Sequence, residues 1–242
     1  VGDIGAKVFE SYSKDEQDLE NRSHTGFSRL DEILKGMSAG NLIILAARPK
    51  LGKTAFALSI AENVAKSGKM VAFYSLEMES SEIYERLLSK RAQVPMNTLI
   101  ERGARAGNSR SEKDKETGFS ARDLEFLKKK IDELSALPIK INDNPACAVN
   151  DIRLESQLVK NLGLIAIDYL QLMRSSKKFE SRNLEVSAIC RELKCLASEL
   201  GVPILCLSQL NRTSDESMRP SPSELRDSDS IEQDANKGAK RS

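Results

Sequence analysis

The sequence lacks the residues that several common kinds of functional site require. It contains no tryptophan, one histidine and 5% aromatic residues in a chain of 242. An aromatic platform for stacking single-stranded bases is therefore not expected to dominate any nucleic-acid contact. With His24 alone, and with no cysteines in a CxxC pair, a zinc site is not expected either. The four cysteines are Cys147, Cys190, Cys195 and Cys206.

Long apolar runs and a large net charge are also missing. No segment approaches the roughly 20 apolar residues that span a membrane, and the first residues have no apolar signal-peptide core. We therefore expect no membrane contact and a reducing, cytoplasmic location. The net charge of +1 excludes a uniformly basic surface, so any nucleic acid binds at a local patch. The length fits one large globular domain or two small ones.

A Gly-Lys-Thr tripeptide stands between a strand-like and a helix-like segment. Residues 41–58 read NLIILAARPKLGKTAFAL, in which an apolar run leads into a loop and then into an alanine-rich helical pattern. This order is the P-loop arrangement, in which backbone N–H groups and the helix dipole attract phosphate. There Lys53 reaches the β- and γ-phosphates and the Thr54 hydroxyl ligates Mg²⁺. We therefore expect ATP and Mg²⁺ at this loop.

The predicted nucleotide-binding loop departs from the usual pattern at its first position. Alanine replaces the first glycine of GxxxxGK[ST], so this position must adopt a negative φ. A chance tripeptide at the start of a helix is the alternative, and the flanking strand and helix favour the P-loop. The loop residues are Ala47, Arg48, Pro49, Lys50, Leu51, Gly52, Lys53 and Thr54.

Five short apolar segments alternate with helical patterns, which predicts an α/β domain with a mainly parallel central sheet flanked by helices. The predicted strands are residues 42–45, 70–75, 138–141, 163–168 and 203–208. Besides the P-loop helix, predicted helices are residues 25–36, a helix opening at 80–82, and residues 123–137, 150–162 and 183–200. Residues 106–120 are polar and are expected to form an exposed loop.

Three polar residues follow three of these strands. Ligands of open parallel sheets bind at the carboxyl ends of strands, so we expect Glu77, Asp168 and Gln209 beside the P-loop. Asp168 would hold Mg²⁺ through its hydration shell, Glu77 would polarise the attacking water, and Gln209 would sense the γ-phosphate. A cap or turn residue is the alternative for Asp168 and Gln209, and a solvated side chain for Glu77. Their combination with a P-loop favours the functional interpretation.

The first residues carry one apolar stripe, with Ile4, Val8 and Tyr12 four apart in a charged segment. Such a stripe belongs to one face of a helix. The helix packs either on its own domain or, as a linker, on another subunit, and the sequence leaves both open.

Together these stretches resemble the C-terminal motor domain of replicative DnaB-type helicases, a hexameric branch of the RecA-like ATPases. The resemblance runs from residue 25 to residue 235. LEM, IDYLQLM and LSQLNR, in this order, are specific to that branch, and the family commonly has ARP or GRP at the start of the P-loop. Further matching stretches are TGFSRLDEILKGMSAG, AARPKLGKTAFAL and RPSPSELRDSDSIEQDA.

The resemblance implies a RecA-like P-loop ATPase that unwinds DNA as a hexameric ring and travels 5′ to 3′. It implies Lys53, Glu77 and Gln209 as catalytic residues. It also implies DNA contacts in a central channel, for which we single out Arg212, Arg226, Glu232 and Gln233. Residues 1–22 would be the linker helix that docks on the neighbouring subunit, and 23–242 the motor domain. The implied partners are single-stranded DNA, a primase and a helicase loader, at the nucleoid in the cytoplasm.

Two departures from the family bear on these expectations. The resemblance implies a helical collar domain that contacts primase, and we expect none of it within this segment. After IEQDA the family continues with Asp and an apolar strand, and later a basic segment supplies an arginine finger in trans, whereas here KGAKRS follows Asn236. We therefore expect C-terminal truncation and assign no arginine finger.

Two other functions stay open at this point. One is a RadA-type recombination ATPase, which LSQLNR and the missing zinc cysteines disfavour. The other is a non-motor ATP-binding partner that loads a helicase, from which duplex unwinding would distinguish a motor.

Overall fold

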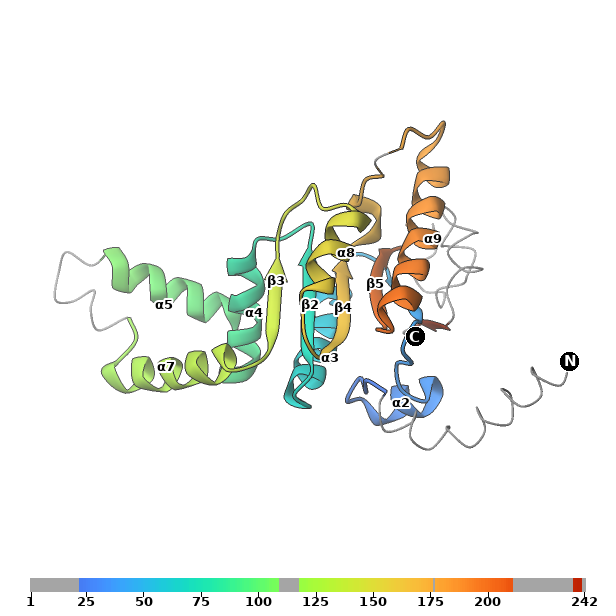
Figure 1. Ribbon diagram of the computed structural model, residues 1–242. Helices are drawn as coiled ribbons and strands as arrows, with labels where there is room; N and C mark the ends of the chain where they lie inside the picture. The colour runs from blue at the N-terminus through green and yellow to red at the C-terminus, as the bar shows by residue number, and fades with distance from the viewer. Residues whose placement is uncertain (1–21, 109–117, 176, 211–236, 241–242) are drawn as a thin grey trace, which may run out of the picture.

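The computed structural model describes residues 22–108, 118–175, 177–210 and 237–240. A twisted sheet stands at the centre, with helices against both of its faces (Figure 1). In chain order the elements are α2 (Ser28–Leu34), β1 (Leu42–Ala47), α3 (Lys53–Lys66), β2 (Met70–Ser75), α4 (Ser80–Ala92), α5 (Met96–Asn108), α7 (Ala121–Ser135), β3 (Ile139–Asn142), α8 (Val149–Gln157), β4 (Leu162–Asp168), η1 (Leu170–Leu172), α9 (Arg182–Leu200), β5 (Ile204–Gln209) and β6 (Lys237–Lys240).

Within the described residues the sheet has six strands in the order β3-β2-β4-β5-β1-β6, and all neighbouring strands are parallel. The five predicted strands are confirmed, although β1 runs two residues further than expected, to Ala47. The sixth strand, β6, was not predicted, because KGAK has no apolar pattern. It is a strand through backbone pairing with β1, from Ile43↔Lys237 to Ala46↔Lys240.

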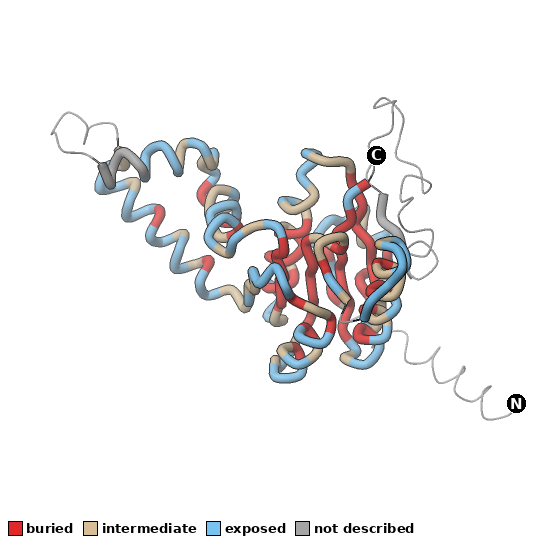
Figure 2. The backbone as a smooth tube through the Cα atoms, turned by 90° about the horizontal axis from the view of Figure 1, so that it is seen from above, coloured by how far each residue is buried: buried red, intermediate tan, exposed pale blue. Residues whose placement is uncertain are grey.

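Both faces of the sheet are buried along the strands β1, β2, β4 and β5, as expected for parallel strands, whereas the edge strand β3 is only partly buried. Alternate residues of β1 enter two separate cores: Leu42 and Ile44 pack with α8 and α9, whereas Ile43 and Leu45 pack with α3 and α4. Figure 2 shows the buried residues gathered in the strands and on the inner sides of these helices. Because the core holds β1, β2, β4 and β5 between two helix layers, the ends of these strands form a fixed edge.

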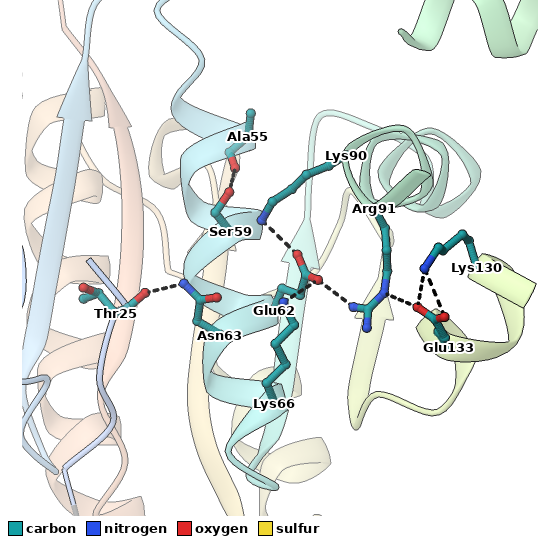
Figure 3. Close-up of polar contacts among 10 residues, drawn as sticks. All are labelled: Thr25, Ala55, Ser59, Glu62, Asn63, Lys66, Lys90, Arg91, Lys130 and Glu133. Carbon is teal, nitrogen blue, oxygen red and sulfur yellow. Dashed lines mark hydrogen bonds and ion pairs between the residues drawn. The ribbon is translucent and has the colours of Figure 1, made fainter. Parts of the chain in front are cut away.

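A buried glutamate ties the P-loop helix to its neighbours. Glu62 of α3, 3% exposed, pairs with Lys66 at 3.0 Å, Lys90 at 2.8 Å and Arg91 at 2.6 Å, and Arg91 also reaches Glu133 of α7 at 3.3 Å (Figure 3). A buried carboxylate needs such compensation. Burial opposes ionisation, but the hydrogen bonds and charges of Lys90 and Lys66 lower the pKa of Glu62. The network joins α3, α4 and α7, and α7 and α5 extend from α4 away from the sheet (Figure 1).

The helix predictions hold for α7 and α9, whose ends differ by at most two residues, and α9 ends at the left-handed Gly201 (φ 62°) as expected. The helix predicted at 25–36 is shorter, because the Asp31 carboxylate accepts hydrogen bonds from Thr25 N and Oγ1, both at 2.8 Å. The helix predicted at 150–162 ends at Gln157, and left-handed Asn161 (φ 55°) leads into β4.

The loop predicted at 106–120 is wrong at its start, where α5 continues to Asn108. Gly103 and Gly107 reduce the helix propensity of α5, which the sequence did not predict. At the other end Ser120 is the cap of α7, since its side chain accepts a hydrogen bond from Asp123 N. The apolar stripe of residues 1–21 lies outside the described residues. Within the described ranges no helix has the length and apolar character to cross a membrane.

Candidate nucleotide-binding site

The loop between β1 and α3 has the geometry of a phosphate-binding turn. β1 ends at Ala47, and α3 begins at Lys53 with Gly52 as its N-cap. Gly52 has φ 76°, a left-handed conformation that glycine adopts without the steric cost of a side chain. The first-turn N–H groups of a helix have no acceptor within the helix and face outward with the positive end of its dipole. An anion at this loop would therefore be favoured.

The alanine at the first loop position is accommodated by the strand. Ala47 is still paired with Gln209 of β5, and it is not among the described residues with positive φ. The expected negative φ is therefore confirmed. The left-handed position in the loop besides Gly52 belongs to Lys50, with φ 66°.

Asp168 and Thr54 meet beneath the loop. Asp168 is the last residue of β4 and is 1% exposed. The Thr54 hydroxyl donates a 2.5 Å hydrogen bond to its Oδ2, and Lys53 Nζ lies 3.7 Å from its Oδ1. Oδ1 is buried without a hydrogen-bond partner. An unsatisfied buried carboxylate oxygen is unfavourable by itself, so this site fits a cation or a water bound to one.

The ammonium of Lys53 is enclosed by two other groups. Besides Asp168 it contacts the Tyr169 ring, with Nζ 4.4 Å from the ring centroid, and its side chain is 12% exposed. Burial lowers the pKa of Lys53, and the charges of Asp168 and Glu77 oppose that shift. Burial also raises the pKa of Tyr169, with the charges of Glu77 and Asp168 acting in the same direction. The phenol therefore stays neutral at pH 7 beside the ammonium.

A cavity of about 480 Å³ opens above these groups, at the carboxyl edge of the sheet. This size suits a small-molecule ligand. Of the predicted residues, Asp168 lies beneath the cavity and Leu51 is 57% exposed at the loop tip. The other predicted nucleotide and catalytic residues line it: Ala47, Arg48, Pro49, Lys50, Gly52, Lys53, Thr54, Glu77 and Gln209.

The residues near the cavity that were not predicted include the polar side chains of Glu82, Arg86 and Gln171. Glu82 and Arg86 of α4 line it, and their four-residue spacing places them on one helix face. The sequence signal that could have pointed to Glu82 and Arg86 is the predicted helix that begins shortly after Glu77. Gln171 holds the end of β5: its Nε2 donates to Ser208 Oγ at 2.9 Å and to Gln209 O at 3.2 Å, and Gln209 N donates to its Oε1 at 3.3 Å.

The predicted DNA contacts lie outside the described residues. They are Arg212, Arg226, Glu232 and Gln233, and they stay predictions. The same holds for the linker helix, since residues 1–21 also lie outside the described part.

Fold and site together define a P-loop nucleotide-binding domain with a buried acid at the end of a neighbouring strand. The chain matches the family model of the DnaB-like helicase C terminal domain over residues 23–237. It is 42% identical over 218 residues to the replicative DNA helicase DnaB of Geobacillus stearothermophilus, a match covering 87% of this chain and 45% of that protein. It is 37% identical over 253 residues to the DnaB of Rickettsia conorii, covering 96% of this chain and 48% of that protein.

Two solved structures have the same fold. The ATPase domain of G40P aligns with a TM-score of 0.83 at 32% identity, over 97% of this chain and 81% of that one. A DnaB-like replicative helicase, described with its interactions with primase, aligns with a TM-score of 0.80 at 31% identity, over 97% of this chain and 54% of that one. The chain therefore belongs to the DnaB-like helicase C-terminal domain family, and its fold is RecA-like, as predicted. It spans about half the length of the curated relatives named here.

Proposed function

We propose that this chain is the ATP-hydrolysing motor of a replicative DNA helicase. In this proposal it works at the subunit interfaces of a hexameric ring and moves 5′ to 3′ along single-stranded DNA. The observation that carries the proposal is the convergence of Lys53, Thr54 and Asp168 under a cavity that Glu77 and Gln209 also line. Family membership supports the helicase function over a recombination ATPase or a loading partner.

The loop and Lys53 bind the phosphates of ATP. Backbone N–H groups at the start of α3 and the Lys53 ammonium supply positive charge where the γ-phosphoryl group is transferred. Because Lys53 is largely buried, its interaction with the phosphates is screened less than it would be in water. Its charge stabilises the negative charge that develops during transfer.

The residues fit a magnesium ion beside the phosphates. Mg²⁺ prefers oxygen ligands, and the Thr54 hydroxyl with the unsatisfied Oδ1 of Asp168 provides them. Thr54 would ligate the ion and Asp168 would hold its hydration shell. When bound, Mg²⁺ neutralises charge on the β- and γ-phosphate oxygens.

Glu77 and Gln209 act on the γ-phosphate side. Glu77 is exposed to the cavity, so it has access to water, and its carboxylate accepts the proton of the attacking water. Gln209 senses whether the γ-phosphate is present. Because β5 leads from Gln209 into the segment with the predicted DNA contacts, the state of the nucleotide is relayed to the DNA.

The proposed partners follow the family. They are single-stranded DNA, identical subunits joined through the linker helix, a primase and a helicase loader. One structural relative is described with its interactions with primase. We place the protein in the cytoplasm at the nucleoid.

The first test is ATP hydrolysis with and without single-stranded DNA, with Lys53→Ala as the blank. We would measure this chain and a version extended past Ser242. Stimulation by DNA in either version supports the motor. Stimulation in the extended version alone places the arginine that acts in trans beyond Ser242. Tight ATP binding without any DNA effect in both versions contradicts the motor and favours a loading partner.

A further inference from the structure

The end of β5 is supported by a strand on one side and by a side chain on the other. The pairing of β1 with β5 continues to Ala47↔Gln209. The pairing of β4 with β5 ends three residues earlier on β5, at Ile167↔Cys206. The last residues of β5 therefore extend past their ladder with β4, at the point where Gln209 enters the cavity.

The amide of Gln171 takes the place of the missing strand. In an extended strand the N–H and C=O of one residue point to the same side. Leu210 N donates to Ala47 O at 3.1 Å, so Gln209 points its own N–H and C=O away from β1. Gln171 meets both of them, accepting from Gln209 N at 3.3 Å and donating to Gln209 O at 3.2 Å.

The same amide also satisfies a buried hydroxyl. Ser208 is 0% exposed, and its Oγ accepts a 2.9 Å hydrogen bond from Gln171 Nε2. One side chain thus fixes two consecutive residues of β5. Loss of the Gln171 amide would leave the buried Ser208 hydroxyl without this hydrogen bond, which is unfavourable.

The turn that carries Gln171 is itself anchored. It begins two residues after Asp168, and Arg182 of α9 donates to Gln171 O at 2.9 Å and to Met173 O at 2.7 Å. Glu185 holds the guanidinium of Arg182 by an ion pair. The turn that follows the proposed magnesium acid therefore also holds the proposed γ-phosphate sensor.

We propose that Gln171 is a positioning residue that holds Gln209 against the γ-phosphate and links it to Asp168. It is not among the described residues that line the cavity, so it acts through Gln209. The inference rests on the proposed function, because it needs Gln209 to contact the γ-phosphate.

The test is the preference of the protein for an ATP analogue over ADP. We would measure the dissociation constants of a non-hydrolysable ATP analogue and of ADP, with Mg²⁺, by calorimetry. The variants are Gln171→Leu, which keeps the size of the side chain without its hydrogen bonds, Gln209→Ala and the double variant. Gln157→Leu is the control. Gln157 is the last residue of α8, its amide donates to the exposed Glu199 of α9, and it is not among the described residues that line the cavity.

We expect Gln171→Leu to lower the preference for the ATP analogue about three- to tenfold, the value of a hydrogen bond, with little change in ADP affinity. Gln209→Ala should have a similar effect, and the double variant should lose no more than Gln209→Ala does. Gln157→Leu should match the wild type. Gln171→Glu keeps the acceptor for Gln209 N and loses both donated hydrogen bonds, so its preference for the ATP analogue should lie between those of the wild type and Gln171→Leu. This variant replaces Gln171→Leu in the test if the leucine variant does not fold.

Three results would overturn the inference. If Gln209→Ala lowers the preference and both Gln171 variants keep it, Gln171 does not position the sensor. If the two effects add in the double variant, Gln171 acts elsewhere. If the wild type binds neither nucleotide, the proposed function fails, and the inference fails with it. The first two results leave the proposed function standing, so the two failures are distinguishable.

Discussion

The hydroxyl of Thr54 lies 2.5 Å from Oδ2 of Asp168, although 114 positions separate the two residues in the sequence. Thr54 is in the first turn of α3 and Asp168 ends β4, which α3 contacts. The hydrogen bond occupies one oxygen of the carboxylate and leaves Oδ1 buried without a donor. The oxygen left without a hydrogen bond supports the proposed magnesium site at this pair.

Replacing Asp168 with asparagine should uncouple nucleotide binding from magnesium. The amide keeps the size of the side chain but removes the charge that attracts the ion. We expect Mg²⁺ to strengthen ADP binding to the wild type and not to the variant, and ATP hydrolysis to fall about 10- to 100-fold, as for other residues that support a metal. Calorimetry with and without Mg²⁺ is the measurement, with Asp132→Asn at an exposed position of α7 as the control. An equal gain from Mg²⁺ in Asp168→Asn would show that the carboxylate plays no part in metal binding.

Glu77→Gln should keep nucleotide binding and lose hydrolysis. The amide cannot take a proton from water, and loss of a general base typically costs about 10²-fold or more. Steady-state ATP hydrolysis and ATP-analogue affinity, measured on the same preparation, separate the two effects. Glu79→Gln is a matched control, because Glu79 lies two residues further on and is not among the described residues that line the cavity. Normal hydrolysis by Glu77→Gln would remove Glu77 from the mechanism.

The parts of the site that could be predicted depend on local sequence signals. An apolar run followed by Gly-Lys-Thr fixes the loop, and an acid at the end of an apolar strand marks Asp168. Because parallel strands share one edge for their carboxyl ends, residues at strand ends could be grouped before the structure was known. Glu77 and Gln209 were grouped in this way, and they do line one cavity.

The parts that could not be predicted depend on packing between distant segments. Gln171 belongs to the IDYLQLM stretch, but the stretch does not say what its side chain contacts, and its role exists only because β5 extends past β4. Arg86 enters the cavity because of the direction in which α4 leaves β2. The strand β6 is made by backbone hydrogen bonds, which four polar and small residues do not signal.

Tyr169 should matter through its ring face and not through its hydroxyl. Lys53 Nζ lies 4.4 Å from the ring centroid, and such cation–π contacts are worth roughly 0.5 to 2 kcal/mol. We expect Tyr169→Phe to hydrolyse ATP like the wild type, and Tyr169→Leu to lose about three- to tenfold in kcat/KM. Both variants have an apolar side chain at position 169. Their unfolding temperatures serve as the control, because they show whether the fold is kept. A phenylalanine variant as impaired as the leucine variant would assign the role to the hydroxyl.

Glu62→Gln should destabilise the protein in a manner that depends on pH. Burial opposes ionisation, but Lys90 and Lys66 lower the pKa of Glu62 in the folded state. The carboxylate therefore stabilises the fold above the ordinary glutamate pKa of about 4.3, and this contribution is lost as the pH falls through the lower folded-state pKa. We expect the free energy of unfolding of Glu62→Gln, measured in urea, to be about 2 kcal/mol lower than that of the wild type at pH 7. The gap should narrow as the pH falls below 4. The control is Glu85→Gln, on the exposed side of α4, whose free energy of unfolding should stay within about 0.5 kcal/mol of the wild type. If the difference between the wild type and Glu62→Gln is constant with pH, the loss comes from packing and not from charge.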